Sequence, residues 1–252
     1  MKKPSFGALL AREFIGMKKM LRAYIIMCLL IIPLPFIILL SFRHGNLGTL
    51  IPEDVHWVFL GMDGYNLKLF AIMGGAMITM GSSENMTPDI SAKWDHFRRS
   101  TPVTHARMAL SKMTSQGIFS LAGIALSLLS LWLMDLALGV EFSAADAGLA
   151  IGTVAALTLF SVLAMLFVTF FRSVDKGMIA MLGVIMVVTF ILLFDKEAPR
   201  VPNEEKLEQA MQFAAKAQDI CTELLPFLPL ILIGTLALGF VALTLLYKRR
   251  ER

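Results

Sequence analysis

Long apolar blocks separated by short polar connections run through most of the chain. Six blocks are long enough to cross a bilayer as helices, which requires about 20 apolar residues each. We expect these spans at residues 23–42, 65–83, 113–134, 147–171, 177–194 and 224–247. The pattern therefore predicts an all-α polytopic membrane protein with six transmembrane helices, formed by residues 1–252 as a single transmembrane domain.

An amphipathic pattern precedes the first span, within residues 1–22. Its apolar side chains recur at spacings of 4, 4, 3 and 4 in the order Phe6, Leu10, Phe14, Met17 and Leu21. Basic side chains lie largely off this stripe. The pattern predicts a helix that lies in the membrane interface and leads into the first span. A simple basic flank that anchors the span is the alternative interpretation, and the two are compatible.

Two prolines lie in the middle of the first span, Pro33 and Pro35. Each removes a backbone donor, so we expect a kink or a break in the helix there. A functional hinge and a static kink are both consistent with this pattern.

Four glycines are candidates for close helix packing because they have no side chain to hold a neighbouring backbone away. Gly74 and Gly75 are adjacent in the second span. Gly148 and Gly152 form a G-x-x-x-G pattern at the start of the fourth span, which is a weak indication of a dimer face.

The distribution of charge predicts the orientation of the spans. With six spans, both chain ends lie on one side, and that side holds 17 of the 23 Lys and Arg residues but only 6 of the 19 acids. Such a bias is typical of the cytoplasmic side of a membrane. We therefore expect both termini, including the basic tail 248–252, to be cytoplasmic.

A second amphipathic segment, residues 195–223, is then expected on the outer side. Its apolar residues recur at helical spacing as Leu207, Met211, Ala214, Ala217, Cys221 and Leu224. We interpret it as an interfacial helix that forms an outer gate or cap.

The longest polar segment on the inner side is residues 84–112, here called the docking loop. Ile90, Trp94 and Phe97 lie at spacings of 4 and 3, so a short helix would carry them on one face. Arg98 and Arg99 follow, and Pro102 stops the helix. The pattern predicts a cytoplasmic element that docks on a partner, whereas a solvated basic loop is the alternative.

Composition supports a membrane protein and excludes several other classes. The chain is 57% hydrophobic and only 17% charged, with a mean hydropathy of +0.72. Its net charge of +4 arises from basic residues beside the spans, so it does not indicate a nucleic-acid partner. Cys28 and Cys221 stand apart from any Cys or His cluster, so no metal site is expected.

Catalytic motifs are absent from the sequence. There is no phosphate-binding G-x-x-x-x-G-K-[ST], and no polar insert reaches 30 residues, too short for an ATPase domain. We therefore expect a non-catalytic chain that binds no cofactor. Lys68 and Glu84 are placed near span ends, which leaves the span interiors without ionisable groups. This argues against ion-coupled transport and favours a hydrophobic or amphipathic substrate.

The docking loop carries a resemblance to a known family. Ile90-Ser-Ala-Lys-Trp-Asp-His-Phe-Arg98, then Thr101-Pro-Val-Thr-His-Ala-Arg107, and finally Ser111-Lys112 are similar to the corresponding loop of bacterial type-2 ABC exporter permeases. In that family, leucine usually occupies the position of Thr101. The order of an amphipathic helix, two spans, an inner loop and four more spans also resembles these permeases. Among them, exporters of amphipathic peptides such as phenol-soluble modulins or bacteriocin-like peptides are the suggested relatives.

The resemblance implies a mechanism and partners. Two permease subunits, identical or different, would pair in the bacterial cytoplasmic membrane, and separate cytoplasmic ABC ATPase subunits would bind ATP and Mg²⁺. The segment 89–101 would be the coupling helix. Its implied ATPase-coupling residues are Asp89, Ile90, Trp94, Asp95, Phe97, Arg98, Arg99 and Pro102. The substrate would be an amphipathic peptide or a lipid-like molecule, and membrane lipid would be a further partner of the chain. An immunity or sensor permease and an ATPase-independent secondary transporter are the alternatives.

Overall fold

The computed structural model describes residues 5–45, 53–85, 103–194, 216, 219–220 and 222–249, and its regular elements are all helices. In chain order they are α1 (Phe6–Gly16), α2 (Lys18–Ile31), α3 (Pro33–His44), α5 (Glu53–Ala76), the 3₁₀ helix η1 (Met77–Asn85), α8 (His105–Leu138), α9 (Ala144–Phe171), α10 (Val174–Phe194) and α12 (Leu228–Arg249). The all-α prediction is confirmed for these residues.

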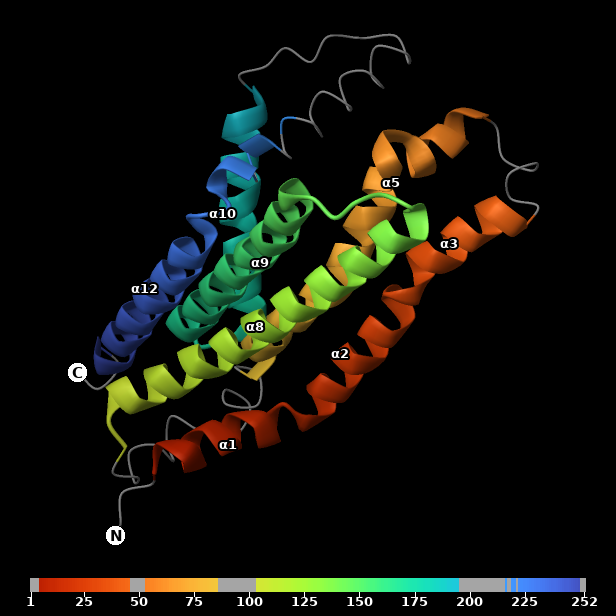
Figure 1. The fold of residues 1–252 in the computed structure, drawn as a ribbon. Helices are drawn as coiled ribbons and strands as arrows, with labels where there is room; N and C mark the ends of the chain where they lie inside the picture. Colours follow the sequence, from red (N-terminus) through yellow and green to blue (C-terminus); the bar gives the residue numbers. More distant parts are fainter. Residues whose placement is uncertain are drawn as a thin grey trace.

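Helix α8 is the centre of the bundle, and α5, η1, α9 and α12 all pack on it (Figure 1). Each of these neighbours runs antiparallel to α8. For example, Tyr247 near the end of α12 lies in one apolar cluster with Met108 near the start of α8. The base of α8, the end of α12 and helix α1 therefore lie at the same end of the bundle, which is called here the basal end (Figure 1).

Helix α1 packs against α8 at the basal end. Ser5 caps it by accepting a hydrogen bond of 3.2 Å from the amide of Ala8. The rings of Phe14 and Phe119 are 5.8 Å apart, and Met17, at the joint between α1 and α2, is 1% exposed. The predicted apolar stripe thus faces protein over part of its length, so an interfacial location of α1 is not established by the fold.

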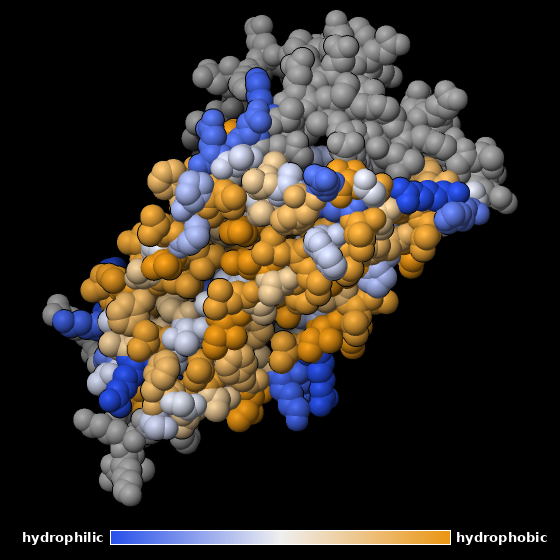
Figure 2. Space-filling model, in the orientation of Figure 1, coloured by the Kyte–Doolittle hydropathy of each residue, from blue (hydrophilic) through white to orange (hydrophobic). Residues whose placement is uncertain are grey.

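Four helical segments are long and apolar enough to cross a membrane: Leu21–His44, His105–Leu138, Ala144–Phe171 and Leu228–Arg249. Figure 2 shows apolar side chains over the middle of one face and hydrophilic ones towards its two ends. The chain is therefore a helical membrane protein. The six-span arrangement stays a prediction, because these four segments are the ones identified within the described residues.

The first predicted span is divided where the prolines lie. Helix α2 ends at Ile31 and α3 begins at Pro33, with Ile32 between them still in the right-handed helical conformation. Pro33 and Pro35 occupy the first turn of α3, where a missing amide donor costs least. The break is thus located, while its role as a hinge stays a prediction.

Helix α8 is longer at both ends than the predicted third span. It begins at His105, eight residues before Met113, because Thr104 accepts a hydrogen bond from the amide of Arg107 and caps the helix. It ends at Leu138, where Gly139 adopts a left-handed conformation with φ of 79°. Hydropathy marks only the part of a helix inside the bilayer, so polar turns beyond it escape such a prediction.

Two loops are consequently shorter than predicted. The connection left between the third and fourth predicted spans, 135–146, is reduced, because α8 continues to Leu138 and α9 begins at Ala144 under a capping box formed by Ser143 and Asp146. The expected turn 172–176 is reduced to Arg172 and Ser173, with Arg172 in the left-handed region at φ of 53°.

Helix α5 begins at Glu53, inside the region expected to be a polar loop at 43–64, so that expectation is wrong for residues 53–64. The polar side chains of residues 53–64 are compatible with a loop as well as with a helix, and the sequence therefore did not predict the helix. The predicted start of the second span at Tyr65 coincides with a backbone change, because Gly64 has φ of 73°.

Candidate functional site

A buried ion pair joins α1 to α8 at the basal end. Lys112 Nζ donates a hydrogen bond of 3.1 Å to Glu13 Oε2. Both side chains are almost fully buried, at 3% and 4% exposed, and Arg12 Nη2 lies 4.0 Å from Glu13 Oε1. The last residue of the docking loop is therefore attached to the N-terminal helix rather than to solvent.

A polar network lies further along α8, centred on Gln116. Its Nε2 donates a hydrogen bond of 3.0 Å to the carbonyl oxygen of Thr79 in η1, and its Oε1 accepts one of 2.7 Å from Ser161 Oγ in α9. The Ser120 and Thr158 hydroxyls are 2.8 Å apart. Because an unpaired polar group is costly in an apolar interior, these contacts hold η1, α8 and α9 in one register.

Helices α5 and α8 approach each other closely about two turns beyond this network. Ser127 Oγ donates a hydrogen bond of 3.0 Å to the carbonyl oxygen of Ile72. A Cβ atom built on Gly75 would lie 2.5 Å from the amide nitrogen of Ser127. The two backbones are therefore in direct contact at Gly75.

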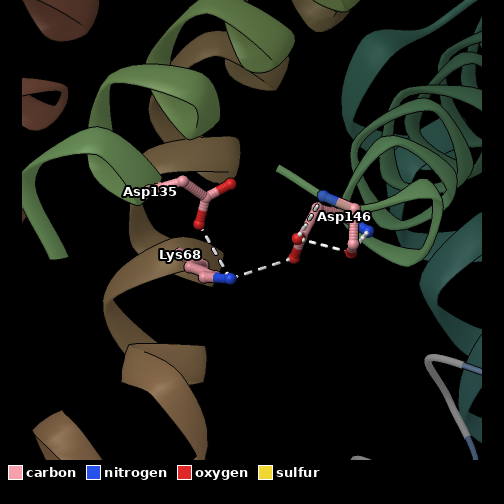
Figure 3. Close-up of polar contacts among 4 residues, drawn as sticks. Lys68, Asp135 and Asp146 are labelled. Carbon is pink, nitrogen blue, oxygen red and sulfur yellow. Dashed lines mark hydrogen bonds and ion pairs between the residues drawn. The ribbon is translucent and has the colours of Figure 1, made fainter. Parts of the chain in front are cut away.

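Three charged side chains meet at the opposite end of the bundle, here called the distal end (Figure 3). Lys68 Nζ of α5 lies 2.8 Å from Asp135 Oδ1 of α8 and donates a hydrogen bond of 3.2 Å to Asp146 Oδ1 of α9. The three side chains are 5% exposed or less. One cation thus faces two carboxyl groups in a buried position.

The two carboxyl groups have different surroundings. Asp146 Oδ2 accepts hydrogen bonds from the amide and the hydroxyl of Ser143, and Asp146 lies in the first turn of α9, where the helix dipole favours a negative charge. Asp135 lies in the last turn of α8, where the dipole opposes a negative charge. Among the described residues, its carboxyl group is held by the 2.8 Å ion pair with Lys68 and has no backbone amide donor such as the one that serves Asp146.

Arg43 reinforces the same end of the bundle from α3. Its Nη1 and Nη2 donate hydrogen bonds of 2.6 and 3.0 Å to the carbonyl oxygens of Ala137 and Leu138, at the C-terminus of α8. A cation at this terminus complements the helix dipole. Together, Arg43 and Lys68 connect α3 and α5 to the end of α8.

The sequence places Lys68 near a span end, and the structure adds that its side chain is buried there between three helices. Its position near the predicted span end was correct, but its partners were not foreseen. One pattern could have indicated buried polar contacts between the helices, because small polar residues recur in the otherwise apolar sequence of α8. The buried serines of this helix are Ser111, Ser115, Ser120, Ser127 and Ser130.

The predicted coupling residues lie outside the described residues. These are Asp89, Ile90, Trp94, Asp95, Phe97, Arg98, Arg99 and Pro102, all within 86–102. Most of the predicted outer amphipathic segment, from 195 to 215, also lies outside them. Of the docking loop, the structure describes 84–85 as the end of η1, 103–104 as the residues before α8, and 105–112 as the start of α8.

The predicted packing glycines occupy different surroundings. Gly74 faces the joint between α2 and α3, because a Cβ atom there would lie 2.9 Å from Ile32 Cγ1. Gly75 faces α8, as described above. Gly148 is buried near the start of α9 and Gly152 is half-buried one turn later. The G-x-x-x-G pair is thus partly covered by this chain's own helices.

A comparison with protein families identifies one match. The family described as "ABC-2 family transporter protein" matches residues 55–246, about three quarters of the 252 residues, from α5 to α12. No curated protein and no solved structure matches the chain.

Proposed function

The chain belongs to the ABC-2 transporter family, and we propose that it is the permease subunit of an ATP-driven exporter for a hydrophobic or amphipathic substrate, with a peptide favoured. The family match over residues 55–246 carries this proposal, because members of the family are membrane subunits of ABC transporters. ATP and Mg²⁺ would bind to a separate ATPase, since the sequence contains no phosphate-binding motif.

The proposed membrane arrangement has six spans with the basal end in the cytoplasm. Two observations support it. The basal end carries the starts of α1 and α8 and the end of α12, so an even number of passes fits the fold. The basic residues are concentrated in the segments that this arrangement places inside, as is usual for cytoplasmic segments. The membrane would be a bacterial cytoplasmic membrane.

The docking loop would transmit force from the ATPase. Both of its flanking elements, η1 and α8, reach the basal end, where a cytoplasmic partner would bind. Within the loop, Trp94 and Phe97 would fill an apolar groove on the ATPase as anchors, and Arg98 and Arg99 would meet acids at its rim. A second permease subunit, identical or different, would complete the pathway.

Ion-coupled transport is a second candidate function, because the structure contains a buried charged cluster. Lys68 and the carboxyl groups of Asp135 and Asp146 are the kind of groups that such transporters use. We favour the ATP-driven exporter, since the cluster lies at the distal end of α8, only three residues before its last residue, rather than at its middle. The lysine also forms ion pairs with both carboxyl groups and so connects three helices, as is usual for ion pairs with a structural role.

The proposed function is tested by co-purification. The chain is expressed with the ABC ATPase encoded next to it, extracted in mild detergent, and compared with a Trp94→Ala, Phe97→Ala double variant. We expect a stable complex that hydrolyses ATP, and its loss in the double variant. As a matched control, Trp132→Ala removes an exposed aromatic side chain from the apolar part of α8 and should leave the complex intact.

The outcomes separate the candidates. If well-folded wild-type protein binds no ATPase, the permease assignment is wrong and the secondary transporter is favoured. If the double variant binds the ATPase as tightly as the wild type, the docking loop is not the anchor, although the permease assignment stands.

A further inference from the structure

The helix that leads into the docking loop changes its type near the middle of the bundle. Helix α5 ends at Ala76 and continues as the 3₁₀ helix η1 for nine residues, Met77–Asn85. Such helices rarely exceed three or four residues, because their hydrogen bonds are less well aligned, and longer stretches often mark a hinge. The length of η1 therefore needs a cause in its surroundings.

Gln116 of α8 makes a polar contact with η1 within this stretch. It is fully buried, and its amide group binds on two sides, to the carbonyl oxygen of Thr79 in η1 and to the hydroxyl of Ser161 in α9. The Thr79 carbonyl is thereby fixed to α8 at a position within the 3₁₀ stretch. Nearby, a Cβ atom on Gly123 would collide with the Thr79 side chain, so α8 also confines η1 by close contact.

A change of helix type in η1 would displace its end substantially. A 3₁₀ helix rises about 2.0 Å per residue against about 1.5 Å for an α-helix, so over nine residues the two differ by about 4.5 Å in length. The difference in residues per turn adds a rotation of about half a turn. Both displacements would appear at Asn85, directly before the part of the docking loop that would hold the ATPase.

We propose that η1 is a length-changing connector between the bundle and the docking loop, and that Gln116 is the positioning residue that holds it in the 3₁₀ form. ATP-driven movement of the docking loop would convert η1 towards an α-helix and release the Thr79 carbonyl from Gln116. This inference rests on the proposed function for its driving force, whereas the hold of Gln116 on η1 can be tested without any ATPase.

The first experiment measures amide hydrogen exchange of the purified permease alone in lipid nanodiscs. The variant Gln116→Leu keeps the size of the side chain but removes its hydrogen bonds, including those with Thr79, Ser120 and Ser161. We expect exchange in 77–85 to become at least about fivefold faster, the factor expected for losing one hydrogen bond. The matched control is Ser127→Ala, which removes a similar bond from α8 to a backbone carbonyl, that of Ile72 in the regular helix α5.

The control separates a local hold from a general loss of stability. Ser127→Ala should change exchange near Ile72 and leave 77–85 unchanged. If Gln116→Leu fails to fold, Ser161→Ala replaces it, because it removes only the hydroxyl that orients the Gln116 amide. Unchanged exchange of 77–85 in the Gln116→Leu or Ser161→Ala protein, or equal acceleration in Ser127→Ala, would overturn the role of Gln116.

The second experiment uses the complex with its ATPase, compared without nucleotide and after trapping with ATP and vanadate. We expect exchange in 77–85 to differ between the two states in the wild type, and the Gln116→Leu complex to hydrolyse ATP with a smaller difference. A complex that hydrolyses ATP while 77–85 exchanges identically in both states would overturn the connector and leave the proposed function intact. Absence of any complex would overturn the proposed function and the connector's driving force together.

Discussion

Lys112 Nζ lies 3.1 Å from Glu13 Oε2, in a buried contact between the base of α8 and the N-terminal helix α1. The two residues are 99 positions apart in the chain. Since Lys112 is the last residue of the docking loop, this contact attaches α1 to the end of the segment that would bind the ATPase. Movement of the loop would therefore also reach α1.

The first prediction concerns this ion pair. Lys112→Met should destabilise the protein by about 3 kcal/mol, because it removes the buried cation that lies closest to the Glu13 carboxyl group among the ion pairs of the described residues. Replacing both residues, as Glu13→Gln with Lys112→Met, should recover most of this loss, since neither charge then stays buried. Thermal unfolding in detergent gives the comparison. A double variant as unstable as Lys112→Met would show that packing, rather than charge, is responsible.

The sequence was sufficient to locate the apolar helices but not the contacts between them. A bilayer requires long apolar segments, so the spans near α2–α3, α8, α9 and α12 follow from hydropathy. It does not require apolar residues outside the bilayer. For this reason, the first turns of α8 from His105 to Lys112 were predicted as loop.

The pairing of polar side chains was not predictable for a different reason. Glu13 with Lys112, and Lys68 with Asp146, are contacts between residues far apart in the chain, and no local pattern encodes them. The 3₁₀ form of η1 was not predictable from the sequence either. Its residues have the same hydropathy in either helix type, and its contact with Gln116 comes from another helix.

The second prediction concerns the left-handed backbone at Gly64, where φ is 73°. Gly64→Ala should cost about 1–2 kcal/mol, because a side chain is strained in this region. The added Cβ would also lie 2.7 Å from Leu138 Cδ1, although that side chain can shift. Gly183→Ala is the control, since it lies in α10 with nothing within 4 Å and should be neutral or slightly stabilising. Equal unfolding temperatures for the two variants would contradict the assignment.

The third prediction concerns the predicted packing glycines of α5. Gly75→Ala should destabilise by about 1–3 kcal/mol, because the new Cβ would meet backbone atoms of Ser127, which cannot move independently of α8. Gly74→Ala should cost less, since its nearest neighbour is the side-chain atom Ile32 Cγ1. Gly234→Ala, in open space on α12, serves as the reference. Unfolding temperatures should fall in the order Gly234→Ala, Gly74→Ala, Gly75→Ala, and a reversed order of the last two would refute the close approach.

The last prediction concerns the distal cluster, where one lysine faces two carboxyl groups. Lys68→Met should be strongly destabilising, by about 3–5 kcal/mol, because it leaves Asp135 and Asp146 buried beside each other without a cation. Asp135→Asn should be tolerated far better. It removes a negative charge that the dipole of α8 opposes, and Lys68 keeps its other partner, Asp146.

Asp146→Asn provides the internal comparison for the same cluster. It also removes one negative charge, but it weakens the capping box with Ser143 and the hydrogen bond from Lys68. We therefore expect unfolding temperatures to decrease from Asp135→Asn to Asp146→Asn and then to Lys68→Met. If Asp135→Asn were as unstable as Lys68→Met, both carboxyl groups would be needed to hold the lysine. In that case all three charged side chains would be required for stability. The alternative is a single ion pair, Lys68 with Asp146, to which Asp135 contributes little.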